Sequence, residues 1–149
     1  MRYSKSLVLI TATFFLIVAP GVTLPGLSAE EAPAAAVSDG VVAFYFHGNT
    51  RCATCRKIEA YADEAIHQGF VQALDTSALT WRVVNIEEPE NRHFVEDFQL
   101  VTRSVVLAEY RDGNLVRWEN LDKVWQLVRD KDGFTSYVQD ETREFLGAS

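Results

Sequence analysis

Residues 41–74 run VVAFYFHGNTRCATCRKIEAYADEAIHQGFVQAL and contain two adjacent segments of different periodicity. The first, Val41 to Phe46, is a continuous run of apolar residues, typical of a strand that is covered on both faces. After a short loop, the segment from Cys52 to Leu74 places apolar residues at spacings of three and four, which predicts an amphipathic helix. The cysteines Cys52 and Cys55 lie at the start of that helix.

The rest of the chain continues an alternation of strands and helices. The expected elements are a strand, a short helix, two further strands and a final helical region, at residues 81–86, 87–98, 104–110, 115–119 and 120–145. The dipeptide Asp112-Gly113 between the last two strands is a strong signal for a hairpin turn. Asn120 can cap the final helical region, and Gly133 predicts a break within it.

The order of these elements, βαβαββα, predicts an α/β fold. A right-handed crossover in the first βαβ unit would give a four-stranded mixed sheet with helices on both faces. The chain has 149 residues, of which 48% are hydrophobic and 23% charged, as in a folded soluble domain. We therefore expect one domain, spanning residues 41–149.

The N-terminal residues 1–29 have the pattern of a secretory signal peptide. Arg2 and Lys5 precede an apolar run, and a small-residue site predicts cleavage after Ala29. Residues 30–40 are small and acidic, which predicts a flexible linker. The expected location is the periplasm or another extracytoplasmic compartment, and the alternative is that the segment stays uncleaved as a membrane anchor.

The overall charge argues against two classes of partner. With 14 Lys and Arg against 21 Asp and Glu, the formal net charge is -7, which disfavours nucleic acid and anionic lipid. A membrane contact is expected only through the N-terminal segment if that segment is retained. The sequence contains no Gly-rich dinucleotide fingerprint, and no cofactor or metal is predicted.

The cysteine motif and its surroundings resemble the thioredoxin-like superfamily. The resemblance rests on an apolar strand, a short loop, Cys52-Ala-Thr-Cys55 at a helix start and a βαββα tail, and it spans residues 41–146. Residues 46–59, 85–94 and 102–107 are similar to a bacterial subgroup often labelled as a nitrophenyl compound nitroreductase subunit. The superfamily implies a thioredoxin-like fold, with Cys52 as nucleophile and Cys55 as resolving thiol.

The residues themselves favour the same chemistry. A helix N-terminus favours a thiolate at Cys52, and the neighbouring cations Arg51, Arg56 and Lys57 add positive potential. The Cys52 thiolate would attack the disulfide of a protein or small molecule, and Cys55 would then resolve the mixed disulfide. A structural role is a poor explanation, because a disulfide that closes so short a loop adds little stability.

Two departures from the superfamily pattern leave other functions open. The position of the buried acidic proton relay falls on Phe46, and the loop near residues 103–105, where most relatives carry a cis-proline, has no proline. A second hypothesis is a binding protein that holds a soft metal or metalloid with Cys52 and Cys55, either alone or with His47 as a third ligand. A third is a non-catalytic interaction subunit.

Overall fold

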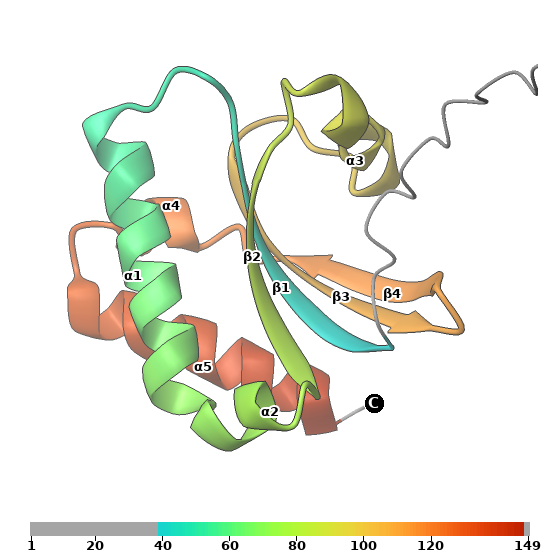
Figure 1. Cartoon of the computed structure of the whole chain (residues 1–149). Helices are drawn as coiled ribbons and strands as arrows, with labels where there is room; N and C mark the ends of the chain where they lie inside the picture. The colour runs from blue at the N-terminus through green and yellow to red at the C-terminus, as the bar shows by residue number, and fades with distance from the viewer. Residues whose placement is uncertain (1–38, 148–149) are drawn as a thin grey trace, which may run out of the picture. The chain divides into compact units, whose positions relative to one another are not determined.

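The structure is a computed structural model that describes residues 39–147. The predicted signal peptide and residues 30–38 of the predicted linker lie outside the described residues. In chain order the elements are β1 (Gly40–His47), α1 (Ala53–Gly69), α2 (Val71–Asp75), β2 (Leu79–Asn85), the 3-10 turn η1 (Pro89–Asn91), α3 (His93–Asp97), β3 (Ser104–Arg111), β4 (Asn114–Asn120), α4 (Val124–Leu127) and α5 (Lys131–Gly147) (Figure 1). Within residues 39–147, no helix is both long and apolar enough to span a bilayer.

The sheet is built around β1. This strand pairs in parallel with β2 and antiparallel with β3, and β4 extends the sheet by pairing antiparallel with β3. The strand order is therefore β2-β1-β3-β4. The predicted α/β fold with a four-stranded mixed sheet is confirmed.

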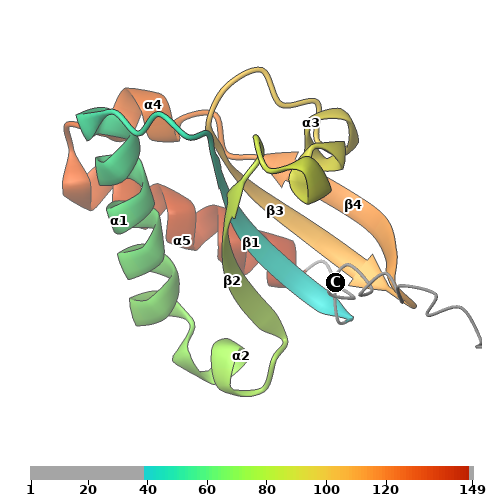
Figure 2. The same cartoon turned by 45° about the horizontal axis from the view of Figure 1, so that its top comes forward.

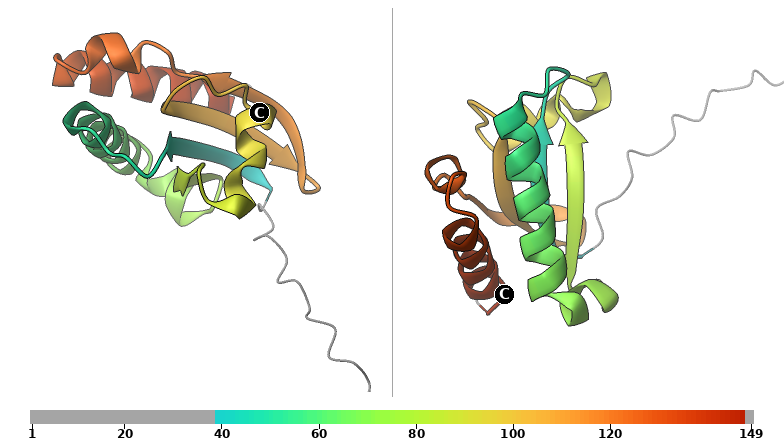
Figure 3. Two further views of the ribbon diagram at one scale, coloured as in Figure 1. Left: turned by 90° about the horizontal axis from the view of Figure 1, so that it is seen from above. Right: turned by 90° about the vertical axis from the view of Figure 1, so that its left-hand side faces the viewer.

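The side chains of β1 alternate between the two faces of the sheet, as the period of a strand requires. Val41, Ala43 and Tyr45 belong to a core cluster that includes residues of α1 and α5, whereas Phe44 and Phe46 belong to a second cluster that includes residues of α3. All of these β1 side chains are buried, so the strand is covered on both sides. Helices lie on both faces of the sheet, as expected (Figure 3).

The hairpin between β3 and β4 forms where the sequence predicts it. Asp112 has a φ of 52° and Gly113 a φ of 72°, the left-handed conformation that two-residue hairpin turns need at both central positions. Only a glycine adopts this conformation without a steric penalty, and aspartate is among the residues that tolerate it best. The antiparallel end of the sheet follows from this local signal.

The helix boundaries differ from the prediction in four places. Residues 87–98 form the 3-10 turn η1 and the short helix α3 rather than one helix. The first helix ends at Gly69, and Phe70 separates it from α2. The C-terminal helical region breaks after α4 at residues 128–130 rather than at Gly133, which lies within α5. Asn120 caps no helix, because it is the last residue of β4 and donates a hydrogen bond to Ser104.

The fold brings two connecting segments and the short helix α4 together at one end of the sheet. The connection from β1 to α1, the connection from α3 to β3, and α4 all lie at the end where β1 finishes and β3 begins (Figure 2). Hydrogen bonds join them: Arg103 donates to the carbonyl of Thr50 over 3.1 Å, and Trp125 donates to the carbonyl of Arg103 over 3.0 Å. The two cysteines lie at this end.

Candidate active site

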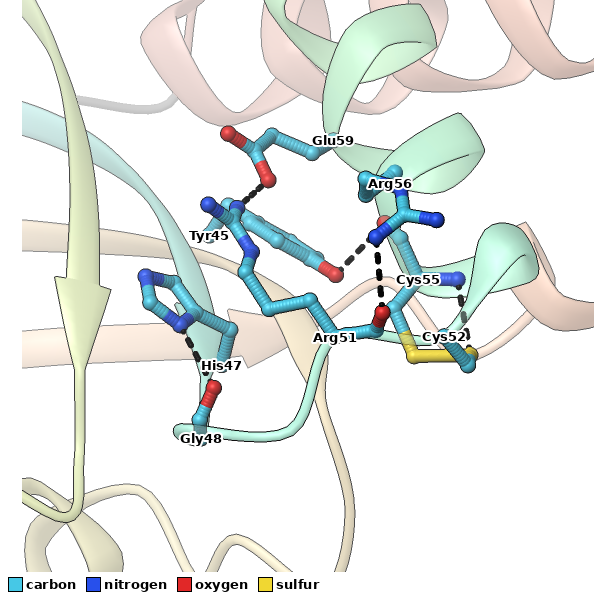
Figure 4. Close-up of polar contacts among 8 residues, drawn as sticks. All are labelled: Tyr45, His47, Gly48, Arg51, Cys52, Cys55, Arg56 and Glu59. Atoms are coloured by element: carbon cyan, nitrogen blue, oxygen red, sulfur yellow. Dashed lines mark hydrogen bonds and ion pairs between the residues drawn. A yellow bond between two sulfur atoms is a disulfide. The ribbon is translucent and has the colours of Figure 1, made fainter.

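The two cysteines lie where β1 leads into α1. A loop leaves the C-terminal end of β1, and Cys52 occupies the position directly before Ala53, the first residue of α1. A disulfide joins Cys52 to Cys55 across the first turn of this helix, with the two Cα atoms 5.1 Å apart (Figure 4). The structure therefore brings together the two residues that the sequence predicts to be reactive.

The two cysteines differ in accessibility. Cys52 is exposed, whereas Cys55 is only 3% exposed. The backbone N–H of Cys55 donates a hydrogen bond to Cys52 Sγ over 3.1 Å. Because the first N–H groups of a helix have no helical partners, this donor is available to stabilise negative charge on Cys52 when the disulfide opens. The exposed sulfur is thus also the one that can carry charge.

Tyr45 lies beneath the disulfide and was not singled out by the sequence. Its side chain comes from β1, is fully buried, and donates a hydrogen bond from its hydroxyl to the carbonyl oxygen of Cys55 over 2.7 Å. Burial raises the pKa of Tyr45, while the nearby cations Arg51 and Arg103 act in the opposite direction. The phenol therefore stays protonated at neutral pH and serves as a hydrogen-bond donor that ties β1 to the first turn of α1.

Phe46 faces the opposite side of the sheet from the cysteines. Its ring packs against Phe94 and Phe98, with ring centroids 5.3 and 5.4 Å away. The residue six positions before Cys52 therefore belongs to the core beneath α3. Tyr45, one residue earlier, supplies the polar group beneath the cysteine pair.

The cations near the cysteines do not act alike. Arg51 forms an ion pair with Glu59, and Figure 4 shows its side chain reaching that carboxylate. Arg56 instead donates from Nη1 to the carbonyl oxygen of Arg51 over 2.9 Å. Lys57 is exposed and has no carboxylate within ion-pair distance among residues 39–147. The charge of Arg51 is thus compensated, and that of its two neighbours is not.

Arg103 adds a cation that the local motif did not reveal. It lies on the segment leading into β3, yet its guanidinium reaches the carbonyl of Thr50, two residues before Cys52. No sequence signal places it there, because the two residues are separated by more than one strand and helix. Every peptide bond of residues 39–147 is trans, including those of this segment.

His47 does not join the cysteines in a metal-binding cluster. Its Nδ1 lies 3.0 Å from the carbonyl oxygen of Gly48, and an N–H at this position donates to that oxygen. Among residues 39–147, no group of three or more His, Cys, Asp or Glu side chains is arranged to hold a metal ion. His47, the third ligand that the metal-binding alternative would use, is therefore engaged in a local hydrogen bond.

Comparisons with known proteins add little to this geometry. No family model matches the chain, and a search of curated proteins gives no match. Among solved structures, a malarial protein is similar over 55% of this chain and 81% of its own, with 12% sequence identity and a TM-score of 0.36. A likeness of this size carries no argument, so the function has to be argued from the site.

Proposed function

We propose that the chain is a thioredoxin-like thiol–disulfide oxidoreductase that acts outside the cytoplasm through Cys52 and Cys55. The observation that carries the proposal is the pairing of an exposed cysteine at a helix N-terminus with a buried one a single turn later. The element order βαβαββα and the resemblance of the motif support the superfamily. The pattern of residues 1–29 supports export.

The exchange takes place in two steps. In the reduced protein, the Cys52 thiolate attacks one sulfur of a substrate disulfide, forms a mixed disulfide with it, and releases the other sulfur as a thiolate that takes up a proton. Cys55 then loses its proton, attacks Cys52 Sγ, and releases the second substrate thiolate. Two electrons pass to the substrate, and the Cys52–Cys55 disulfide is formed. The reverse sequence oxidises a substrate dithiol.

Three features of the site support these two steps. The N–H of Cys55 and the 17-residue helix α1 stabilise the Cys52 thiolate. Exposure of Cys52 admits the substrate, whereas burial of Cys55 restricts it to attack within the protein. The hydrogen bond from Tyr45 to the Cys55 carbonyl fixes the turn that the second step requires. Tyr45 is therefore a positioning residue.

The proposal is tested by measuring the rate at which dithiothreitol reduces insulin, with the turbidity of the precipitating insulin chains as the readout. We expect the wild-type chain to accelerate the reaction and Cys52→Ser to abolish the acceleration. Cys55→Ser should accumulate a mixed disulfide with the substrate, because the resolving thiol is missing, whereas Cys52→Ser should not.

The same variants distinguish the proposed function from the two competing ones. Metal binding would be the function if two results were found together. The wild type would fail to accelerate the reaction, and it would bind a soft metal ion tightly and stoichiometrically, whereas Cys52→Ser would not bind it. A Cys55→Ser variant that captures no substrate would point to an interaction subunit whose cysteines do not exchange.

A further inference from the structure

We infer that the substrate of Cys52 carries carboxylates beside its reacting sulfur atoms. The inference rests on the proposed function and adds the chemical class of the disulfide. It comes from the arrangement of uncompensated cations at the Cys52–Cys55 turn, in a chain whose formal net charge is -7. An anion is repelled by the chain as a whole, so a cationic site at the exposed sulfur is a local feature.

Arg56 is the first of these cations. It lies four residues after Cys52, and positions four apart on a helix share a face one turn apart. Its hydrogen bond to the carbonyl of Arg51 holds the guanidinium beside the turn that carries the disulfide (Figure 4). The residue is exposed, and no carboxylate lies within ion-pair distance of it among residues 39–147.

Arg103 is the second cation and approaches from a different segment. Its Nη2 donates to the carbonyl of Thr50, on the loop that precedes Cys52. It is half-buried, and within the described part of the chain it forms no ion pair. Two cations from separate parts of the fold therefore border the loop and turn that present Cys52.

The acidic residues nearby do not cancel this pair. Glu59 is engaged with Arg51, and Asp63 lies 3.4 Å from His67, one turn further along α1. The carboxylate of Glu87 lies against Gly48, which the guanidinium of Arg103 also approaches, but within residues 39–147 the two groups form no ion pair. Neither Arg56 nor Arg103 forms an ion pair within the described residues, so each is available to a substrate carboxylate, with Glu87 the acidic residue that competes for Arg103.

Exchange produces negative charge at the sulfur atoms, so the cations act on the reaction as well as on binding. A doubly anionic disulfide brings its carboxylates to Arg56 and Arg103, while its sulfur meets the Cys52 thiolate. Without those cations, the thiolate and the substrate would repel one another. The attraction should weaken when salt shortens the Debye length from about 30 Å at 0.01 M to about 8 Å at 0.15 M.

The test uses three small disulfides of similar size: dithiodipropionate, which is doubly anionic, hydroxyethyl disulfide, which is neutral, and cystamine, which is doubly cationic. The rate constant for oxidation of the reduced full-length chain is measured with each, and each is divided by the rate constant of free dithiothreitol with the same disulfide. This division removes differences in intrinsic reactivity. The readout is the anion-to-cation ratio of the normalised rate constants.

We expect this ratio to be at least about 10 at low salt and to fall several-fold at about 0.15 M salt. Arg56→Gln and Arg103→Gln should each lower it about three-fold or more, because each removes one charge next to the substrate. Arg56→Lys and Arg103→Lys should preserve most of it. Arg143→Gln, at the far end of α5, is the matched control and should leave it unchanged.

Three results would overturn the inference in different ways. A wild-type ratio of about one or less, with hydroxyethyl disulfide still reduced, would reject anionic selectivity and leave the proposed function intact. Failure to react with all three disulfides would reject the proposed function, and the inference with it. A ratio that falls equally in Arg143→Gln would assign the selectivity to the overall charge and reject the local site.

Discussion

At the scale of single residues, the hydroxyl of Tyr45 is the group that connects the sheet to the reactive turn. It is fully buried and donates to the carbonyl of Cys55, so it acts on the backbone of the buried cysteine. Burial raises its pKa, which keeps the proton on the hydroxyl throughout the neutral range. The residue therefore contributes position and not proton transfer.

Tyr45→Phe tests this role, because it removes the hydroxyl and keeps the ring. We expect the free energy of unfolding, measured by urea denaturation, to fall by about 1 kcal/mol. The mixed disulfide should also resolve more slowly in single-turnover experiments. Tyr110→Phe is the control, since Tyr110 is a buried phenol on β3 that should leave the resolution rate unchanged. Unchanged resolution in Tyr45→Phe would show that the hydroxyl only stabilises the fold.

Tyr45 also shows where reasoning from the sequence was incomplete. The superfamily pattern assigns the proton-relay position to Phe46, which the structure places on the other face of the sheet. The alternation of side chains along β1 could have identified Tyr45, because residues two apart share a face and Ala43 faces α1. The cysteines themselves could be predicted, because their reactivity depends on a local motif.

At the scale of elements, α5 begins at a cap that the sequence analysis placed elsewhere. Asp130 Oδ1 accepts a hydrogen bond from the N–H of Gly133 over 3.1 Å, which satisfies one of the unpartnered donors of the first turn. Gly133 suggested a break because glycine weakens a helix interior. Within the first turn of α5, however, its cost is offset by the cap that precedes it.

Asp130→Ala should therefore destabilise the protein. We expect a loss of about 1 kcal/mol in the free energy of unfolding, since the cap is lost and the helix remains otherwise intact. Asp130→Asn is the control, because asparagine is an equally good cap. Equal losses in both variants would assign the effect to the charge of Asp130 and not to capping.

An ion network around one buried carboxylate ties β3, β4 and α5 together. Glu109 on β3 has a side chain that is only 4% exposed, and it accepts from Arg117 over 2.6 Å and from Arg111 over 2.7 Å. Arg117 also donates to the carbonyl of Phe145 over 2.5 Å and lies over its ring. The hydrogen bond from Arg117, with that from Arg111, lowers the pKa of Glu109 below 4.5 in spite of its burial.

This network predicts acid sensitivity. A carboxyl whose pKa is lower in the folded than in the unfolded state stabilises the fold above the unfolded value, and this contribution is lost as the pH falls through the folded value. The free energy of unfolding should therefore decline below pH 4.5. Glu109→Gln should lower the free energy of unfolding at neutral pH and make its decline in acid less steep, as measured by urea denaturation across the acid range. An equally steep decline in Glu109→Gln would show that other carboxyls cause it.

At the scale of the whole molecule, the site is assembled from segments that are distant in the sequence. The loop before Cys52 meets Arg103, and the carbonyl of Arg103 in turn accepts a hydrogen bond from Trp125 in α4. The first βαβ unit and the hairpin between β3 and β4 could be anticipated from the apolar pattern and the turn signal, because these are local, whereas the pairing of β3 with β1 could not. The contact between Arg103 and Thr50 could not, since it depends on how the folded sheet brings two loops together.

The disulfide contributes little to bracing the fold. The core is formed by the two clusters on either face of the sheet, and Cys52 lies outside them at an exposed helix start. The bridge closes a loop with only two intervening residues, so it restricts the unfolded chain little. Opening it should leave the sheet and its helices in place.

The equilibrium reduction potential of the Cys52–Cys55 pair tests the central claim most directly, and it is measured by titration of the purified chain against a thiol–disulfide buffer. A pair that exchanges with substrates should have a potential between about -120 and -270 mV, the range of known exchange proteins. A potential below about -300 mV would identify a stable structural bridge and contradict the proposed function.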